Sequence, residues 1–388
     1  MAKKFKHHSL TGRITPALLL TAFQAVKANR GAAGLDQVSI AMFERNLEQN
    51  LESLLHDLKR RCYRPQPLRR VYIPKPGSPQ RRPLGIPAVR DRVAQEVVRR
   101  LLNPIFEPLF HDDSYGFRPA RNCHQAIERL LQLNREGYTF LVDADIQGFF
   151  DGIDHDLIMG FVAAEVADGN ILNLIEKFLK SGVLEDGALK PTPKGTPQGG
   201  VISPLLANIV LNHLDWQLQA QGLRFVRYAD DFVVLCTSAA QAEEALACIT
   251  HVIEQELKLH LHPDKTRLAR FAEGFEFLGF AISSRACTMR AKASENFKLK
   301  VRQLTRRSCN LDAHVILQLN RVIRGTVNYF ATGFSTVRTQ FRELDKWIRR
   351  RLRCMQYKYT SMHHNHRLRN WKFTRLGLLS AYDLCRRC

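Results

Sequence analysis

Two apolar runs enclose a pair of acidic residues in the segment 224–236, RFVRYADDFVVLC. Strand-forming residues stand on both sides of Asp230 and Asp231, and such runs joined by a tight turn predict two short buried strands. Neighbouring carboxylates repel each other, and leaving the pair uncompensated beside a core would cost several kcal/mol. The pattern alone therefore leaves two alternatives, which are a solvated turn and a turn that binds metal ions.

Helical periodicity marks the first third of the chain. Residues 14–61 predict helices that are interrupted by the glycine-rich segment NRGAAGLDQ at 29–37. Residues 62–90 are rich in proline and predict an extended hairpin that carries cations. Residues 91–110 predict a helix, because six apolar side chains fall on one of its faces. These six are Val93, Val97, Val98, Leu101, Leu102 and Ile105.

The middle of the chain mixes strands and helices. The segment 138–155, YTFLVDADIQGFFDGIDH, predicts a buried strand that ends in carboxylates. A helix is expected after the glycine turn at 199–200, with Ser203 at its N-cap, Pro204 at its first position and four core residues. These four are Leu206, Ile209, Val210 and Leu214.

The last third is predicted to be helical apart from one strand. A helix is expected near 239–257, a single strand over FEFLGFAIS at 275–283, and basic helices after about residue 290. No segment alternates regularly enough for a doubly wound parallel sheet, so the predicted fold class is α+β.

Length and composition are those of a globular protein with two or three domains. The chain has 388 residues, 45% of them hydrophobic, and no apolar run is long enough to span a membrane. The start predicts an amphipathic helix rather than a signal peptide. Nine scattered cysteines suit reduced thiols in a cytosol better than a disulfide framework.

One cysteine pair, Cys385 and Cys388, stands at the end of the chain. A pair supplies two of the four ligands that structural zinc needs, although His363, His364 and His366 could complete such a site. We expect an exposed tail here rather than a metal site.

Charge separates the chain into two parts. Residues 291–388 hold 22 Lys or Arg and 5 Asp or Glu, a net charge of +17, whereas the remainder carries only +4. Positive charges gathered at this density repel one another unless the segment binds a polyanion. Ten aromatic residues stand among these charges, which suits nucleic-acid phosphates and stacked bases better than an anionic membrane. They are Phe297, Tyr329, Phe330, Phe334, Phe341, Trp347, Tyr357, Tyr359, Trp371 and Phe373.

A second acidic cluster favours the metal-binding alternative for the turn of Asp230 and Asp231. The cluster lies on and after the strand predicted in 138–155, and its members are Asp143, Asp145 and Asp151. A strand that ends in Asp and a hairpin that ends in Asp-Asp can bring three carboxylates together. Mg²⁺ prefers carboxylate and phosphate oxygens. Two such ions about 3.5–4 Å apart stabilise the attacking and leaving oxygens of an in-line phosphoryl displacement.

The order of motifs resembles a group II intron-type reverse transcriptase with maturase function. Eight motifs carry the resemblance in the family's order, and these are GAAGLDQ, PKPGSPQRRPLGIP, SYGFRPARNCHQAI, ADIQGFFDGIDH, GTPQGGVISPLLANIVLNHLD, YADD, LHPDKTRL and FEFLGFAI. They cover about residues 30 to 285, and RGTVNYF and DKWIRRRLR extend the resemblance into the thumb, called domain X in maturases.

The resemblance implies a right-hand polymerase. It predicts an N-terminal extension over residues 1–60, fingers and a palm of antiparallel sheet plus helices over 61–290, and a basic α-helical thumb or domain X over 291–388, without an endonuclease domain. The implied partners are an RNA template and primer, deoxynucleoside triphosphates, a DNA target and, if an intron surrounds the gene, group II intron RNA. A membrane partner is not expected, and the oligomeric state stays open.

The resemblance also assigns the catalytic carboxylates. Asp145, Asp230 and Asp231 would hold two Mg²⁺ ions, with the backbone carbonyl of Ile146 as a further ligand and Mn²⁺ as a substitute ion. The other acidic residues of the cluster are expected to cap helices or to be solvated. They are Asp143, Asp151, Asp154 and Asp156.

Five residues are implied to contact the incoming nucleotide. Lys75 and Arg82 stand where the family places cations on the triphosphate, and Lys265 would lie near the triphosphate or the metal site. Phe150 would exclude a ribose 2′-hydroxyl, and Gln198 would let the backbone approach the incoming base pair. The alternatives are surface charges for Lys75 and Arg82 and core packing for Phe150.

The densest basic cluster, KWIRRRLR, predicts an RNA-binding face on a helix. Lys346, Arg349, Arg350 and Arg353 fall within one broad face, which leaves Trp347, Ile348 and Leu352 for packing or stacking.

Three rival functions differ in testable features. An RNA-dependent RNA polymerase would usually place a polar group at Phe150 and Gly before its Asp pair, where this chain has Ala229. A non-catalytic RNA-splicing chaperone often loses one Asp of the hairpin, but both are present here. A domesticated or phage-defence reverse transcriptase without an intron would have much the same sequence, and only the flanking nucleotides would distinguish it.

Overall fold

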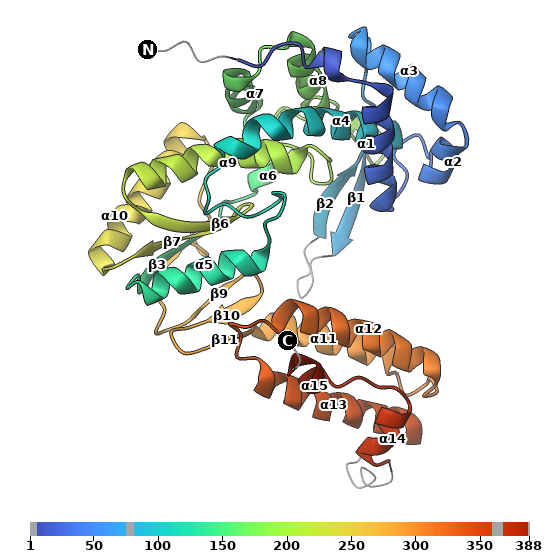
Figure 1. Cartoon of the computed structure of the whole chain (residues 1–388), viewed down its shortest axis with the longest axis vertical. Helices are drawn as coiled ribbons and strands as arrows, with labels where there is room; N and C mark the ends of the chain where they lie inside the picture. The colour runs from blue at the N-terminus through green and yellow to red at the C-terminus, as the bar shows by residue number, and fades with distance from the viewer. Residues whose placement is uncertain (1–5, 75–80, 359–367, 387–388) are drawn as a thin grey trace. The chain divides into compact units, whose positions relative to one another are not determined.

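A computed structural model describes residues 6–74, 81–358 and 368–386 of the chain. The chain divides into two compact units, Met1–Leu268 and Ala269–Cys388 (Figure 1). The first unit combines helices with two four-stranded sheets, and the second is mainly helical with one small sheet. This mixture confirms the predicted α+β fold class. The domain boundaries expected at residues 60 and 290 remain predictions.

Helices form the start of the first unit, as the apolar periodicity predicts. Thr15 caps α1 (Pro16–Ala28) by accepting a hydrogen bond from the Leu18 amide, and Ser39 caps α2 (Ile40–Arg45). All six apolar residues predicted to share a face of α4 (Val89–Phe106) are buried. The elements are η1 (Thr11–Arg13), α1 (Pro16–Ala28), α2 (Ile40–Arg45), α3 (Leu47–Lys59), α4 (Val89–Phe106) and η2 (Glu107–Leu109).

The predicted cationic hairpin forms one side of the first sheet. β1 (Leu68–Pro74) pairs antiparallel with β2 (Arg81–Ile86), and Ile73 lies opposite Arg82. The sheet continues to β4 (Val183–Glu185) and β5 (Ala188–Lys190) in the order β2-β1-β4-β5. The tip of the hairpin, which includes Lys75, lies outside the described residues.

The second sheet contains both acidic strands predicted from the sequence. Its order is β6-β7-β3-β8. Val226 lies opposite Val233, and Val142 lies opposite Val234, so fully buried β-branched side chains stand side by side on adjacent strands. The elements are β3 (Phe140–Ala144), β6 (Arg224–Tyr228), β7 (Asp231–Cys236) and β8 (Arg267–Arg270).

Helices pack on this second sheet. α5 (Cys123–Arg135) and α9 (Ser203–Ala220) contact β6, and α10 (Ala239–Thr250) contacts β7 and β3. The helix predicted near 239–257 continues beyond α10 as the π-helical turn η3 (His251–Glu256). The remaining helices are α6 (Phe149–Gly152), α7 (His155–Glu165) and α8 (Gly169–Leu179).

The start of α9 differs from the prediction. Its four expected core residues are buried, but the N-cap is Ile202 and Ser203 is the first helical residue. The Ser203 hydroxyl donates to the Pro197 carbonyl at 2.9 Å instead of accepting from the helix amides. The hydroxyl was thus a wrong signal for the cap, because it fixes the preceding glycine turn.

A hairpin replaces the single strand predicted over FEFLGFAIS. β9 (Phe275–Phe277) and β10 (Phe280–Ile282) are separate strands that pair antiparallel, with Phe277 opposite Phe280. The turn between them places Leu278 and Gly279 at positive φ, which Gly adopts without strain. β11 (Cys287–Met289) completes this sheet of the second unit.

The rest of the second unit is helical, as predicted. Its core is made of rings that the sequence suggested for stacking on bases, so that expectation is wrong for Phe297, Phe341 and Phe373, which are buried. Trp371 is 54% exposed, and the Lys372 ammonium stands 5.8 Å from the centre of its ring. The helices are α11 (Ala291–Leu304), α12 (Ala313–Phe330), α13 (Arg338–Tyr357), α14 (Asn370–Arg375) and α15 (Ala381–Cys385).

The end of the described chain is not an exposed tail, contrary to expectation. Cys385 is buried in α15, which packs on α13 and α12. The Asp345 carboxylate of α13 accepts hydrogen bonds from the Ala381 and Tyr382 amides and holds α15 in place. Cys388, His363, His364 and His366 lie outside the described residues. None of the described helices has the length and apolar character that crossing a bilayer would require.

Candidate active site

The turn between β6 and β7 carries the paired carboxylates. Tyr228 lies opposite Asp231 at the end of the ladder, and Ala229 and Asp230 form the turn itself. Ala229 has a φ of 59°, the left-handed conformation that residues with a side chain rarely adopt. Asp230 is partly buried and Asp231 is exposed. The adjacent carboxylates therefore meet different surroundings.

Asp145 follows the strand that neighbours this turn. β3 pairs with β7 so that Ala144 lies opposite Phe232, which places Asp145 beyond the ladder at the end where β7 begins with Asp231. The Asp145 carbonyl accepts a hydrogen bond from the His262 amide at 2.8 Å. Its carboxylate forms an ion pair with Lys265 Nζ, also at 2.8 Å. The segment around Lys265 thus fixes both the backbone and the side chain of Asp145.

The electrostatics of Asp230 link it to Asp145. Burial raises the pKa of Asp230, and the Asp145 carboxylate raises that pKa further. A backbone hydrogen bond and the guanidinium groups of Arg82 and Arg227 oppose this rise. Three of the predicted site residues, Asp145, Asp230 and Arg82, therefore lie close enough to influence one another, and the two carboxylates share a need for positive charge.

The carboxylates do not form a closed cage. Among the described residues, the only three metal-ligating side chains whose ligand atoms all lie within 4.8 Å of one another are His56, Asp57 and Cys62. That cluster is a poor metal site, because Asp57 is paired with Arg90 and burial of the sulfur together with Asp57 raises the pKa of the Cys62 thiol. The ligand atoms of Asp145, Asp230 and Asp231 are more widely spaced than those of this cluster, and the Asp145 carboxylate pairs with Lys265.

The backbone at Ile146 leaves its carbonyl unused by the neighbouring strand. Ile146 forms an isolated antiparallel bridge with Leu261. The bonds of that bridge run from the His262 amide to the Asp145 carbonyl and from the Gln147 amide to the His260 carbonyl. Because successive carbonyls of an extended strand point to opposite sides, the Ile146 carbonyl faces away from residues 260–262.

Arg82 and Gln198 come together through the first sheet. The Gly85 amide of β2 donates to the Gln198 carbonyl at 2.9 Å, so the glycine turn is attached to the strand that carries Arg82. The Gln198 side chain donates to Asp151 at 3.1 Å. A Cβ on Gly199 would lie 2.8 Å from the Gly85 carbonyl oxygen, so this approach requires glycine. Arg82 itself is exposed.

Phe150 is partly buried beside the same turn. Its ring packs edge to face on Phe149 at 5.2 Å, and its carbonyl accepts from the Thr196 amide at 2.6 Å. Part of the ring packs on the core and part stays exposed. Core packing and a contact with a sugar are therefore both compatible with this placement.

The four predicted RNA-binding residues of α13 have different surroundings. Lys346 is exposed and pairs with Glu343, Arg350 is exposed, and Arg349 is half-buried. Arg353 donates to the Leu368 carbonyl and to Asn370 Oδ1, each at 2.9 Å, and its guanidinium stands over the Phe373 ring. Arg353 thus anchors the end of the chain on α13, so its guanidinium is committed within the protein. As predicted, Ile348 and Leu352 pack in the core.

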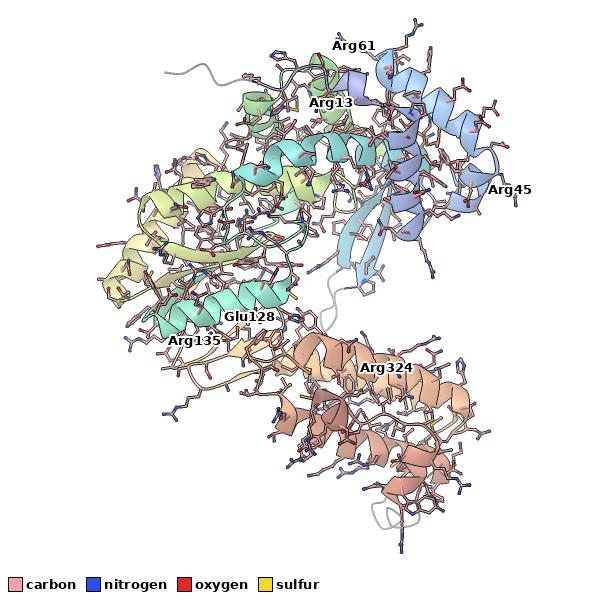
Figure 2. All side chains as sticks on the ribbon, in the orientation of Figure 1. Arg13, Arg45, Arg61, Glu128, Arg135 and Arg324 are labelled. Atoms are coloured by element: carbon pink, nitrogen blue, oxygen red, sulfur yellow. The ribbon has the colours of Figure 1, made fainter. Side chains whose placement is uncertain are left out.

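A groove with both apolar and charged lining residues lies between α11 and α12 in the second unit. It encloses about 730 Å³, and Lys300 and Arg321 stand on its two sides with Asn296 and Gly325. Arg324 projects from α12 as an exposed side chain (Figure 2). The positive charge of this unit is therefore spread over α12 as well as over α13.

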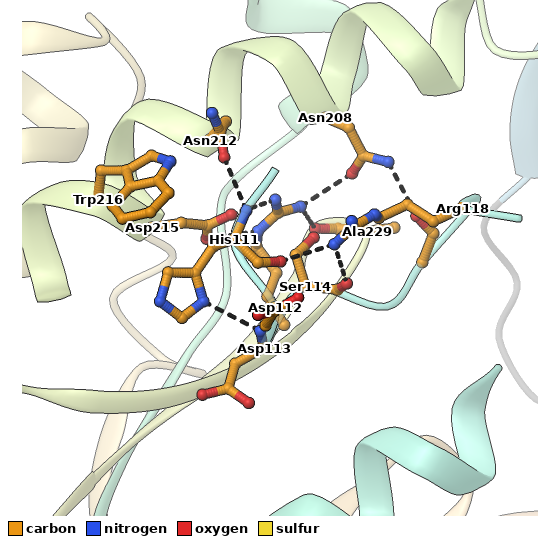
Figure 3. A network of polar contacts seen from close by, with 12 residues as sticks. His111, Asp112, Asp113, Ser114, Arg118, Asn208, Asn212, Asp215, Trp216 and Ala229 are labelled. Atoms are coloured by element: carbon orange, nitrogen blue, oxygen red, sulfur yellow. Dashed lines mark hydrogen bonds and ion pairs between the residues drawn. The ribbon is translucent and has the colours of Figure 1, made fainter. Parts of the chain in front are cut away.

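A buried polar network that no sequence motif indicated lies behind the acidic turn (Figure 3). Arg227 and Asp215 are both fully buried and form a two-pronged ion pair. Arg227 also donates to Asn208 Oδ1 and to the Ala229 carbonyl, each at 2.9 Å. A charged residue at an inward position of an apolar strand was the available signal, since such a side chain needs a buried partner.

Two family models match the chain. The model described as reverse transcriptase (RNA-dependent DNA polymerase) matches residues 73–282, more than half of the chain. The model described as group II intron, maturase-specific domain matches residues 294–377.

Curated relatives agree with these matches. The protein YkfC of Escherichia coli (strain K12) is 36% identical over 307 residues, covering 69% of this chain and 80% of that protein. The group II intron-encoded protein LtrA of Lactococcus lactis subsp. cremoris is 32% identical over 342 residues, covering 70% of this chain and 56% of LtrA. This chain therefore matches little more than half the length of LtrA.

A solved structure gives a weaker likeness. The telomerase from Candida albicans, determined with a fragment of telomeric RNA, has a TM-score of 0.46 at 12% identity, covering 78% of this chain and 62% of that chain. It adds nothing to the family assignment.

Proposed function

The chain belongs to the reverse transcriptase family and carries a group II intron maturase-specific domain, and from this premise we propose that it copies RNA into DNA at the turn of Asp230 and Asp231. The observation that carries the proposal is the placement of Asp145 within electrostatic reach of Asp230, with Arg82 and Lys265 beside them. Carboxylates and cations are the groups that a phosphoryl-transfer site requires.

The carboxylates suit the divalent metal ions that membership of the family implies. Burial and, to a lesser degree, the nearby Asp145 carboxylate raise the pKa of Asp230, and a bound cation would compensate both effects. Carboxylate oxygens are the ligands that Mg²⁺ prefers. Asp145, Asp230 and Asp231 would hold two Mg²⁺ ions, with Mn²⁺ as a substitute, and the Ile146 carbonyl would be a further ligand. When bound, these ions would polarise the phosphoryl oxygens and stabilise the attacking and leaving oxygens.

The surrounding residues would position the nucleotide. Arg82 would contact the triphosphate with its planar fork, since guanidinium groups match phosphate geometry. Lys75 is proposed for the same role from the sequence, although it lies outside the described residues. Gln198 and the adjoining glycines would let the backbone approach the incoming base pair. Lys265 would lie near the triphosphate or the metal site, and its ion pair with Asp145 orients that carboxylate.

The proposed partner of the second unit is structured RNA, with group II intron RNA as its natural form. The maturase-specific match and the net charge of +17 over residues 291–388 support this proposal. We infer that the protein assists splicing of such an RNA and the copying of the intron into a DNA target. A group II ribozyme in the nucleotides that flank the gene would support this extension, and its absence would point to a reverse transcriptase without an intron.

Purified protein should extend a DNA primer on an RNA template when Mg²⁺ and deoxynucleoside triphosphates are present. Gel analysis of a labelled primer measures the extension, and EDTA should abolish it. Ribonucleoside triphosphates in place of deoxynucleotides test the rival RNA polymerase function. A protein that binds RNA yet extends no primer under any of these conditions would contradict the proposed activity and favour a splicing chaperone.

Replacing Arg349 and Arg350 together by Gln should weaken RNA binding by the second unit. Each phosphate contact contributes roughly 0.7 to 0.9 to the slope of log affinity against log salt, so two lost contacts should flatten the slope by about 1.4 to 1.8. Fluorescence anisotropy with a labelled structured RNA at several salt concentrations measures both quantities. Arg353 is left intact, because its guanidinium anchors Leu368 and Asn370.

The matched control removes the same charge from the first unit. Arg13 and Arg45 are exposed, and their side chains project into solvent (Figure 2). Their replacement by Gln should leave the salt slope almost unchanged. If both double variants bind RNA with wild-type slopes and affinities, α13 is a solvated face and RNA is bound elsewhere.

A further inference from the structure

We propose that the buried pair of Asp215 and Arg227 positions the catalytic turn, and that Arg227 acts on the reaction through the Ala229 carbonyl. The inference rests on the proposed role of Asp230 in holding a divalent ion. Arg227 and Asp215 touch neither a nucleotide nor an ion, so they are positioning residues and not catalytic ones.

All three guanidinium nitrogens of Arg227 donate hydrogen bonds. Nε donates to Asp215 Oδ1 at 2.7 Å, and Nη2 donates to Asp215 Oδ2. Nη1 donates to two acceptors at 2.9 Å, which are Asn208 Oδ1 and the Ala229 carbonyl. Because Asp215 and Asn208 belong to α9, the side chain connects the middle of this helix to the turn (Figure 3).

The bond to the Ala229 carbonyl is where this pair differs from ordinary core packing. Apolar side chains of similar volume can replace a buried ion pair without loss of stability. They cannot donate to a carbonyl. Ala229 is held in the left-handed conformation, and a residue with a side chain stays there only when its surroundings fix it. The peptide that Arg227 holds is the one that leads directly into Asp230.

A second segment supports the turn from the opposite direction. The Arg227 amide donates to the Asp113 carbonyl, and the Tyr115 amide donates to the Arg227 carbonyl. Asn208 Nδ2 donates to the Gly116 carbonyl at 2.8 Å. A Cβ on Gly116 would lie 2.2 Å from the Ala229 nitrogen, so the backbone of this segment lies directly against the turn. Asn208 thus binds both Arg227 and the segment that supports the turn.

These contacts restrict the conformation of the turn, and the Arg227 guanidinium is the side chain that restricts the Ala229 peptide. The Gly116 backbone limits motion on one side, and the Arg227 guanidinium fixes the Ala229 carbonyl on another. Loss of the guanidinium alone would let the Ala229 peptide rotate and would move the Asp230 carboxylate relative to Asp145. Metal affinity should therefore fall even when the core remains well packed.

The decisive variant replaces the whole pair, Arg227→Met with Asp215→Leu. It leaves no buried charge unpaired, so the fold should survive, which circular dichroism and the melting temperature check. Two readouts then test positioning. The first is hydrogen exchange of the peptide covering residues 224–236. The second is Mn²⁺ affinity, measured by electron paramagnetic resonance in a complex with an RNA template, a dideoxy-terminated DNA primer and a deoxynucleoside triphosphate.

We expect faster exchange in this peptide and about tenfold weaker Mn²⁺ binding in the double variant. Adding Ala229→Gly to the double variant should recover part of the lost Mn²⁺ affinity. Glycine adopts the left-handed conformation without strain, so it does not need the hydrogen bond from Arg227 to stay there. A structural role alone would not predict such a rescue. Wild-type exchange and wild-type Mn²⁺ affinity in the double variant would overturn the proposal.

Arg227→Lys keeps the proposal testable if the double variant does not fold. Lysine retains the charge that Asp215 needs but lacks the planar fork that reaches three residues at once. Faster exchange of residues 224–236 in a folded Arg227→Lys protein supports the proposal, and unchanged exchange contradicts it. If the wild-type complex itself binds no Mn²⁺, the proposed function fails, whereas the exchange measurement still decides whether Arg227 fixes the turn.

Discussion

Replacing Asp230 by Asn should lower primer extension by about a thousandfold or more while RNA affinity stays close to that of the wild type. Asn offers one neutral oxygen where the carboxylate offers two charged ones, so the divalent ions would lose several kcal/mol of interaction in the transition state. Asp145→Asn and Asp231→Asn should have effects of similar size. Single-turnover extension of a labelled primer measures the loss, and anisotropy with the same RNA measures affinity.

Stability should not account for that loss. Burial raises the pKa of Asp230, which means that the folded protein tolerates its charged form less well than water does. Asn removes this cost, so the Asp230→Asn protein should melt at the wild-type temperature or slightly above it.

Asp143→Asn is the matched control on the same acidic strand. Asp143 lies on β3 and pairs with Arg267 at 3.3 Å, and the sequence places it outside the metal-binding set. Its replacement should change extension by less than about threefold, since exposed ion pairs contribute little. Near wild-type extension by the Asp231→Asn protein, or an equal loss in the Asp143→Asn protein, would contradict the assignment of the ligands.

Replacing Phe150 by Ala should raise the use of ribonucleotides relative to deoxynucleotides by about ten- to a thousandfold. The ring is proposed to clash with a ribose 2′-hydroxyl, and a site discriminates against a substrate when binding it creates such a clash. Competing extension reactions with each nucleotide give the ratio of kcat/KM values. Use of deoxynucleotides should fall much less than use of ribonucleotides rises.

A second partly buried phenylalanine separates sugar selection from loss of packing. Phe161 of α7 packs on the same hydrophobic core and contacts the His213 ring. Phe161→Ala should lower stability to a similar extent as Phe150→Ala but leave the nucleotide ratio unchanged. Equal ratios in both variants and in the wild type would mean that Phe150 is a core residue.

Local patterns in the sequence predicted most elements of the first unit. The hairpin of β6 and β7 and the helix α4 depend on apolar periodicity, which the final structure must respect in order to bury those side chains. Ser203 misled because a hydroxyl near a helix start can bond to a turn as well as to helix amides. The single strand predicted at 275–283 failed because periodicity does not reveal a turn whose residues are apolar.

Long-range polar contacts were the part that the sequence could not supply. Arg353 has the spacing of a solvated cation, yet a segment fifteen residues later provides the acceptor that binds it. Arg227 and Asp215 are twelve residues apart on different elements, and only the packing of α9 on β6 makes them a pair. The acidic residues proposed for the site stand in short motifs, whereas the residues proposed to position them obey no short motif.

The ion pair between Lys265 and Asp145 would make the lysine ammonium compete with divalent ions for the Asp145 carboxylate in the proposed site. Lys265 is 58% exposed, and exposed pairs of this kind are weak and readily exchanged. A group tethered to the protein has an effective concentration set by its linkage, commonly millimolar, and not by the surrounding solution. A divalent ion that binds Asp145 must therefore displace a weakly held ammonium group that is part of the same chain. The length and position of the Lys265 side chain would then partly determine the concentration of divalent ions at which the proposed site fills.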